Sequence, residues 1–162
     1  MNAPIVTQAR VVDVQFGTNV RIVEPVNLYG CSVGDNCFIG PFVEIQRNAR
    51  IGNNCRVQSH SFICELVEMG DDCFVAHGVM FINDLFRIGR PAGGDKTQWR
   101  STVVGSRVSI GSNATILPVR ICDDVVIGAG AVVTRDIDVP GVYAGNPARR
   151  LHSLPECGDR ER

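Results

Sequence analysis

Three polar side chains recur at a spacing of 18 along the chain, at Arg47, Glu65 and Asn83. A carboxylate and an amide carbonyl can both accept hydrogen bonds from an amine or ammonium group, so this series suits the binding of a substrate nitrogen. Asp84 follows Asn83 directly and adds a second carboxylate. The alternative interpretation is a solvated ladder whose surface ion pairs contribute at most about 1 kcal/mol.

The chain has three histidines, and a histidine can accept a proton near neutral pH. His60 and His77 stand three and two residues after the apolar residues Val57 and Val75, and we expect both to point outward. His77 is the candidate general base. The alternative is a histidine that hydrogen-bonds neighbouring backbone or lines a subunit interface. His152 lies near the C-terminus, where a surface position is expected.

These residues stand within an apolar repeat of period six, which neither a helix nor a flat strand produces. Its main run consists of Val33, Ile39, Ile45, Ile51, Val57, Ile63, Met69, Val75 and Phe81. It resumes with Val104, Ile110, Ile116, Ile121, Ile127, Val133 and Val139, and it begins with Phe16, Ile22 and Leu28. Two steps are five residues long, from Leu28 to Val33 and from Ile116 to Ile121.

The composition favours strands. Val and Ile total 36 residues while Leu totals 6, which argues against a helical bundle. The net charge of −1 argues against a nucleic-acid surface over the whole protein. No secretory signal is visible at Met1–Pro4, and no apolar run could span a membrane. The seven cysteines are an odd number, so they cannot all pair within the chain. We therefore predict a cytoplasmic protein with reduced thiols and no membrane partner.

The repeat breaks at residues 84–100, which lack the period and contain Pro91, Gly93, Gly94 and the only Trp. Long ordered loops are usually functional. We expect a single domain over residues 1–162, with the repeat at about 16–149, this loop, and a short tail at 150–162. The end of the tail, Glu156–Arg162, is expected to be mobile.

The pattern resembles the hexapeptide-repeat family, whose chains wind as a left-handed parallel β-helix with three six-residue units in each triangular coil. The resemblance implies an all-β fold. A second period of 18 supports it, because Cys37, Cys55 and Cys73 would then form one column. Cysteine suits a narrow corner as a small apolar residue, so we predict buried thiols and no metal.

A narrower resemblance rests on residues 39–46 (IGPFVEIQ), 57–65 (VQSHSFICE) and 76–84 (AHGVMFIND). They look like the nucleotide-sugar N-acetyltransferases of this superfamily, particularly those that acetylate the 3-amino group of a UDP-linked 2-acetamido-3-amino-glucuronate. Relatives act on dTDP-linked 3-amino-6-deoxyhexoses. Residues 110–118, 127–136 and 144–149 match the acetyl-CoA half. The product would feed surface polysaccharide synthesis.

The resemblance implies catalytic roles for Asn83, His77 and Asp84. The predicted substrate-binding residues are Glu65, His60 and Arg47, of which Glu65 and Arg47 share the column of Asn83. Whether His77 or the departing thiolate takes the proton stays open. His77 and Asn83 are six residues apart and fall on consecutive corners of the coil. A site that uses both therefore needs two subunits, in agreement with the homotrimers of the family.

Acetyl-CoA is the implied co-substrate, and small residues are expected to admit its pantetheine arm. The five-residue step gives a spacing of 17, which aligns Gly111, Gly128 and Gly145. The residues assigned to coenzyme binding are Gly111, Ser112, Gly128, Ala129, Arg135, Asn146 and Arg149, with the arginines meeting phosphates. The alternative is that the glycines merely permit turns.

Two other functions are weighed against this one. A zinc carbonic anhydrase on the same fold needs three well-placed histidines, and His60, His77 and His152 lack that spacing. A non-catalytic β-helix scaffold would need neither Asn83–Asp84 nor the glycine and arginine features of the donor half.

Overall fold

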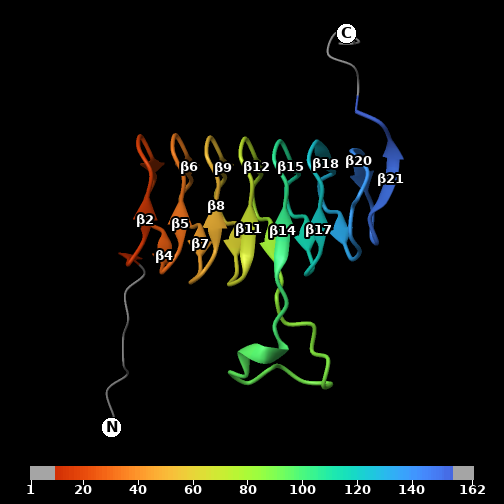
Figure 1. The fold of residues 1–162 in the computed structure, drawn as a ribbon, viewed down its shortest axis with the longest axis horizontal. Coiled ribbons are helices and arrows are strands. Elements are labelled where there is room, and N and C mark those ends of the chain that lie inside the picture. The colour runs from red at the N-terminus through yellow and green to blue at the C-terminus, as the bar shows by residue number, and fades with distance from the viewer. Residues whose placement is uncertain (1–9, 155–162) are drawn as a thin grey trace.

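The chain winds as a left-handed β-helix whose coils lie side by side along the long axis of the molecule (Figure 1). The computed structural model describes residues 10–154. Successive coils contribute short strands to three sheets, which form the three sides of a prism of about 7 turns. The predicted all-β hexapeptide-repeat fold is confirmed.

Each sheet is built from every third strand of the chain as far as β19, and the last two strands both join sheet C. Sheet A contains β1 (Val11–Val12), β4 (Asn27–Tyr29), β7 (Glu44–Ile45), β10 (Phe62–Ile63), β13 (Met80–Phe81), β16 (Thr115–Ile116) and β19 (Val132–Val133). Sheet B contains β2 (Gln15–Phe16), β5 (Ser32–Val33), β8 (Arg50–Ile51), β11 (Val67–Met69), β14 (Thr102–Val104) and β17 (Arg120–Ile121). Sheet C contains β3 (Arg21–Ile22), β6 (Phe38–Ile39), β9 (Arg56–Val57), β12 (Phe74–Val75), β15 (Ser109–Ile110), β18 (Val125–Ile127), β20 (Gly141–Ala144) and β21 (Arg149–His152).

The period of six arises because one six-residue unit covers one side of the prism. Each strand turns one large apolar side chain inward, and Ile39, Ile63 and Phe81 are fully buried in this way. A smaller residue, such as Val43 or Cys55, fills the corner. Residues that point outward are not needed by the core, so they are free to carry chemistry.

The register confirms the two five-residue steps. Val33 pairs with Ile51 at a sequence spacing of 18, whereas Phe16 pairs with Val33 and Val104 with Ile121 at a spacing of 17. Val11 pairs with Leu28 at the shorter spacing too, so the described solenoid begins five residues before the predicted start at Phe16.

The three cysteines spaced by 18 form a buried column. Cys37, Cys55 and Cys73 are each at most 2% exposed, and each thiol donates to a backbone carbonyl of the following coil at 3.1–3.2 Å. The predicted burial of this column is confirmed, and the thiol hydrogen bonds are a further finding. Among residues 10–154 no group of three or more metal-ligating side chains is placed to hold an ion, and the absence of metal stays a prediction.

The last coil differs from the predicted repeat. Ile137 is buried and bridges Ile121, whereas Val139 is 52% exposed. Two hydrogen bonds explain the change: Asp136 accepts the Arg120 N–H (2.8 Å), and the Ile137 N–H donates to the Arg120 carbonyl (2.8 Å). They draw Ile137 into the place that the period assigns to Val139.

The predicted loop leaves the solenoid between β13 and β14 and projects well away from it (Figure 1). It contains a single 3-10 turn, η1 (Lys96–Gln98), capped by Asp95, which accepts the Thr97 N–H. No helix within the described residues is long and apolar enough to cross a membrane.

The C-terminal segment is not a plain tail. Arg149–His152 forms β21, which reverses direction and pairs antiparallel with β20. The N-terminal Met1–Pro4 and the expected mobile end, Glu156–Arg162, lie outside the described residues.

Candidate functional site

Asn83 lies at the corner that joins sheet A to sheet B, called here the AB corner. The pairing of β7, β10 and β13 places Arg47, Glu65 and Asn83 in one column on successive coils. The Asn83 side-chain amide donates to the Glu65 backbone carbonyl (3.2 Å), and the Asn83 backbone carbonyl accepts the Arg100 N–H (2.9 Å). These bonds fix the amide at the point where the loop leaves the coil.

Glu65 is the only buried charged residue within residues 10–154. Its two carboxylate oxygens lie 2.8 and 2.9 Å from the ammonium nitrogen of Lys96, which comes from the loop. The expected outward-facing ladder is therefore interrupted, because the loop covers Glu65 and leaves its side chain 11% exposed. Arg47 remains exposed beside it.

Asp84 organises the loop. One carboxylate oxygen accepts the Phe86 N–H (2.9 Å) and the other accepts the Ala92 N–H (2.8 Å). The carboxylate thus ties two points of the loop's first half to the AB corner. This contact gives Asp84 a clear positional role, and its predicted catalytic role stays a prediction.

His77 lies at the corner that joins sheet C to sheet A, called here the CA corner. It is exposed, and its Nδ1 is 2.8 Å from the Ser59 hydroxyl on the preceding coil. If Nδ1 carries the proton and donates to Ser59, Nε2 is left as a proton acceptor that faces solvent. Ser59 is thus the group that orients the ring, in a chain where no carboxylate follows His77.

His60 lies at the same corner one coil earlier and stacks on Phe42. The two ring centroids are 4.8 Å apart and the rings are within 13° of parallel. The histidine points outward, as predicted, but its contact is an aromatic ring that the sequence argument did not include.

The predicted coenzyme residues begin on the same corner as His77. Strand pairing places Ser112 and Ala129 on the two coils after His77, with Gly111 and Gly128 beside them. The glycines are required by close stacking, because a Cβ at Gly111 would lie 2.5 Å from the Ala129 nitrogen.

The predicted alignment of Gly145 with Gly128 is wrong. Ile127 pairs with Tyr143, so the final coil is one residue shorter than the coil before it and Ala144 lies next to Gly128. The shortening comes from the tight path through Asp136 and Ile137. Asn146, which depended on this alignment, is an exposed residue in the turn between β20 and β21.

Arg135, Arg149 and Arg150 line one pocket of about 190 Å³ at the C-terminal end of the solenoid, together with Tyr143 and Ala148. Asp136 is the one carboxylate in the lining. The excess of arginine makes this pocket suited to an anion such as a phosphate. The structure therefore brings together Arg135 and Arg149, which come from opposite sides of strand β20 in the sequence.

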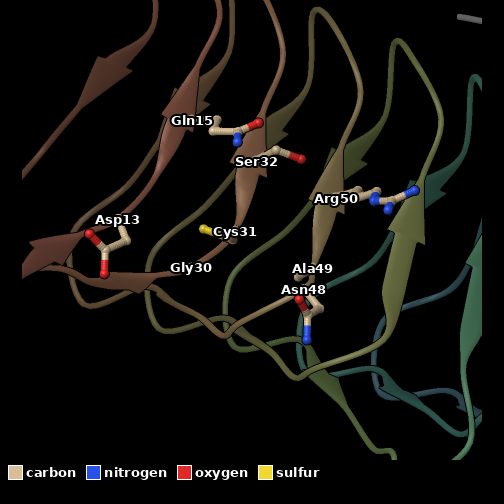
Figure 2. A pocket seen from close by; sticks show the side chains of 8 residues that line it. All are labelled: Asp13, Gln15, Gly30, Cys31, Ser32, Asn48, Ala49 and Arg50. Carbon is tan, nitrogen blue, oxygen red and sulfur yellow. The ribbon is translucent and has the colours of Figure 1, made fainter.

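A second pocket, of about 200 Å³, lies over the first coils at the AB corner and sheet B (Figure 2). Its polar side chains include Asp13, Gln15 and Arg50, and none of the predicted site residues lines it. The Arg50 side chain points toward the neighbouring strand β11 (Figure 2). Its guanidinium lies 3.7 Å from the Glu68 carboxylate.

Sequence reasoning missed Ser59, Lys96 and the aromatic partner of His60. The spacing of 18 that revealed the cysteine column also leads from His77 back to Ser59 and from His60 back to Phe42. Lys96 gave no such signal, because the loop that carries it has no period. Its one distinguishing feature is that it is the only lysine in the chain.

Six-residue units that each cover one side of a three-sided prism are the structural mark of a hexapeptide repeat. The family described as bacterial transferase hexapeptide (six repeats) matches residues 30–65, and the hexapeptide repeat of succinyl-transferase matches residues 101–135. These matches support the hexapeptide-repeat transferase superfamily.

Among curated proteins, the chain is similar to the bifunctional protein GlmU of Picosynechococcus sp., with 32% identity over 128 residues. The match covers 78% of this chain and 26% of that protein, so the chain spans about a quarter of the relative's length. AntD, an N-acyltransferase from Bacillus cereus solved with dTDP and coenzyme A, has the same fold with a TM-score of 0.77 and 23% identity, over 90% of this chain and 86% of AntD. A galactoside acetyltransferase solved with coenzyme A gives a TM-score of 0.64 and 29% identity, over 76% and 64%.

Proposed function

We propose that the protein transfers an acetyl group from acetyl-CoA to an amino group of a nucleotide-linked sugar. The observation that carries the proposal is Glu65, whose carboxylate holds the primary ammonium of Lys96 beside the Asn83 amide. A carboxylate that binds one ammonium through both oxygens suits the amino group of an acceptor. The nucleotide and coenzyme bound to AntD support the class of both substrates.

The acceptor within this class is the 3-amino group of a UDP-linked 2-acetamido-3-amino-glucuronate, with a dTDP-linked 3-amino-6-deoxyhexose as the alternative. This choice rests on the segments around Phe42, Ser59 and His77. Acetyl-CoA and nucleotide sugars are cytoplasmic metabolites, so the proposal includes a cytoplasmic location and a product used in surface polysaccharides.

In the reaction, the neutral amine nitrogen attacks the thioester carbonyl carbon. A carbon–nitrogen bond forms, the carbon–sulfur bond breaks, and coenzyme A leaves as the thiolate. The amine loses one proton, which goes either to Nε2 of His77 or to the departing thiolate. Asn83 and Glu65 orient the amine for attack once it has displaced Lys96 from the Glu65 carboxylate, and orientation of this kind supplies a large share of the rate of a two-substrate reaction.

The donor is proposed to lie along the CA corner. The pantetheine arm follows the small residues Gly111, Ser112, Gly128 and Ala129, and the phosphates reach the pocket of Arg135 and Arg149. Asn146 lies in the turn next to that pocket. Its exposed side chain lets it contribute a hydrogen bond there despite the corrected alignment.

A homotrimer completes the proposed site. His77 is at the CA corner and Asn83 is at the AB corner of the same coil, so one small amine cannot contact both within one chain. In the proposed trimer, His77 of one subunit faces Asn83 of its neighbour. Mixed trimers of inactive His77→Asn and Asn83→Ala subunits should then regain activity after subunit exchange. If the subunits are shown to have exchanged and the mixture stays inactive, the site is not shared between subunits.

The function is tested by acetyl transfer from acetyl-CoA to a panel of UDP- and dTDP-linked amino sugars. We expect N-acetylated product from at least one of them, and a higher melting temperature with acetyl-CoA because a ligand of the native state stabilises it. A scaffold protein would show neither result. A rise in melting temperature with acetyl-CoA but no product from any sugar would support acetyl-CoA as the donor and reject nucleotide-linked amino sugars as the acceptors.

A further inference from the structure

Phe42 occupies a corner position where the backbone disfavours its bulky side chain, and His60 occupies the same position one coil later. Both have a left-handed backbone, with φ of 61° and 63°. The later coils place Gly78, Asn113 and Gly130 at the same corner position, also at positive φ. Glycine and asparagine adopt this conformation readily, whereas a bulky aromatic residue there is an outlier. The outlier calls for a role that glycine or asparagine could not fill.

The Phe42 ring is presented to solvent. One face stacks on His60, and the residue is still 56% exposed. Its side chain therefore contributes little to the core, and burial of the ring does not offset the strain of the left-handed backbone. A rigid, half-open aromatic ring on a fixed corner is a surface on which a planar ligand can stack.

A pocket of about 250 Å³ lies beside this ring. It is lined by Pro25, Val26, Asn27, Phe42, Val43 and Glu44, and it is mostly apolar. Its two polar side chains are Asn27 and Glu44, and the Glu44 carboxylate accepts hydrogen bonds from the side-chain amides of Asn27 (3.1 Å) and Gln46 (2.9 Å). Within the described residues no cation pairs with Glu44. Two neutral donors hold the carboxylate in place and leave it able to accept further hydrogen bonds.

This pocket and the AB corner share sheet A. Tyr29 lies between them: burial raises its pKa, and the nearby carboxylates of Glu44 and Glu65 raise it further. Phe42 and Arg47 are five residues apart, which corresponds to a distance of roughly 16 Å at the rise of a β-strand. An extended nucleoside diphosphate sugar can bridge such a distance, with its amine at Glu65 and its base at Phe42.

We propose that Phe42 and Glu44 form the nucleoside subsite, in which the base stacks on Phe42 and the Glu44 carboxylate accepts hydrogen bonds from the ribose hydroxyls. This inference rests on the proposed function and deepens it by assigning the nucleotide end of the acceptor. A carboxylate that accepts hydrogen bonds from both ribose hydroxyls binds a ribonucleotide more tightly than a deoxyribonucleotide, because deoxyribose lacks the 2′-hydroxyl.

The test is the affinity for UDP, measured by titration calorimetry on the purified full chain. Phe42→Asn takes the residue type found at the equivalent Asn113, so the fold should tolerate it. We expect UDP to bind at least about tenfold more weakly, and Phe42→Tyr to bind nearly as the wild type does. The matched control is Phe74→Ala, another phenylalanine that is 38% exposed but on sheet C. It should leave UDP affinity unchanged.

Glu44→Gln provides the second measurement. We expect it to lower the ratio of UDP to dTDP affinity, because its main loss is of hydrogen bonds to the ribose. Unchanged UDP affinity in folded Phe42→Asn, or no UDP binding by the wild type, overturns the subsite. Neither result touches acetyl transfer to the sugar panel, so failure of the subsite is separable from failure of the proposed function.

Discussion

The ammonium of Lys96 lies 2.8 Å from one carboxylate oxygen of Glu65 and 2.9 Å from the other, and this contact fastens the long loop to the solenoid. The two partners differ in environment, with side chains 57% and 11% exposed. Trp99 adds to the contact, since the Lys96 nitrogen lies 5.3 Å from its ring centroid. The loop is therefore positioned by a charged group of the same kind as the proposed acceptor amine.

Lys96→Gln is expected to lower the free energy of unfolding by about 1–3 kcal/mol, because it leaves a mostly buried carboxylate without its charged donor. Urea unfolding measures the change. The control is Arg50→Gln, which removes the exposed pair between Arg50 and Glu68 and should cost less than about 1 kcal/mol. Equal losses in the two variants would contradict the special position of Glu65.

Asn83→Ala is expected to reduce kcat/KM by at least about tenfold, or roughly 1.4 kcal/mol of transition-state stabilisation. The reason is loss of the side-chain carbonyl that orients the amine. Steady-state kinetics with a substrate found in the sugar panel measures it, and a melting curve checks folding. Near-normal kinetics in a folded variant would reject the role of Asn83.

His77→Asn separates the two routes for the proton. If His77 is the general base, its loss should lower kcat about 100-fold or more, and one ionisation should disappear from the profile of rate against pH. We expect a smaller loss in kcat, as for a residue that only shapes the site. The profile of rate against pH should then still show deprotonation of the substrate amine. Ser59→Ala is the companion variant, because it removes the partner of Nδ1. A loss in kcat on the scale of His77→Asn would show that ring orientation carries the effect.

Arg149→Gln is expected to weaken acetyl-CoA binding about tenfold, through loss of a charge-assisted hydrogen bond to a phosphate. The difference from wild type should shrink as salt is raised. Arg21→Gln, on sheet C near the first coil, serves as the control for loss of one positive charge. A salt-independent difference, or an equal effect of the control, would argue against a phosphate pocket.

Two buried thiols should make stability depend on alkaline pH. Burial raises the pKa of Cys31 to about 11 and that of Cys64 to about 12, from the ordinary 9.0. A raised folded-state pKa contributes stability that is complete below pH 9 and is lost as the pH rises toward these values. Urea unfolding at pH 8 and pH 10.5 should show a smaller fall for Cys64→Ala than for the wild type. An equal fall in both would disprove the coupling.

The sequence predicts the solenoid well because each six-residue unit buries the same two positions, one large and one small, so burial imposes a period of six on the sequence. The five-residue steps before Val33 and Ile121 were readable for the same reason. Ile137 was not, since hydrogen bonds to Arg120 override the period in the final coil. The column of Arg47, Glu65 and Asn83 was predictable from the spacing, but its cover by Lys96 was not. That contact depends on how an aperiodic loop folds back.

The antiparallel strand β21 has a consequence for assembly. A stack of parallel coils would otherwise end in a row of unpaired backbone groups, to which the first coil of another molecule could add. β21 lies at that edge of sheet C, and it runs against the direction of every other strand in the sheet. Arg149 and Arg150 place positive charge on the same edge. The reversed strand and its two arginines therefore disfavour the addition of a further parallel coil along sheet C.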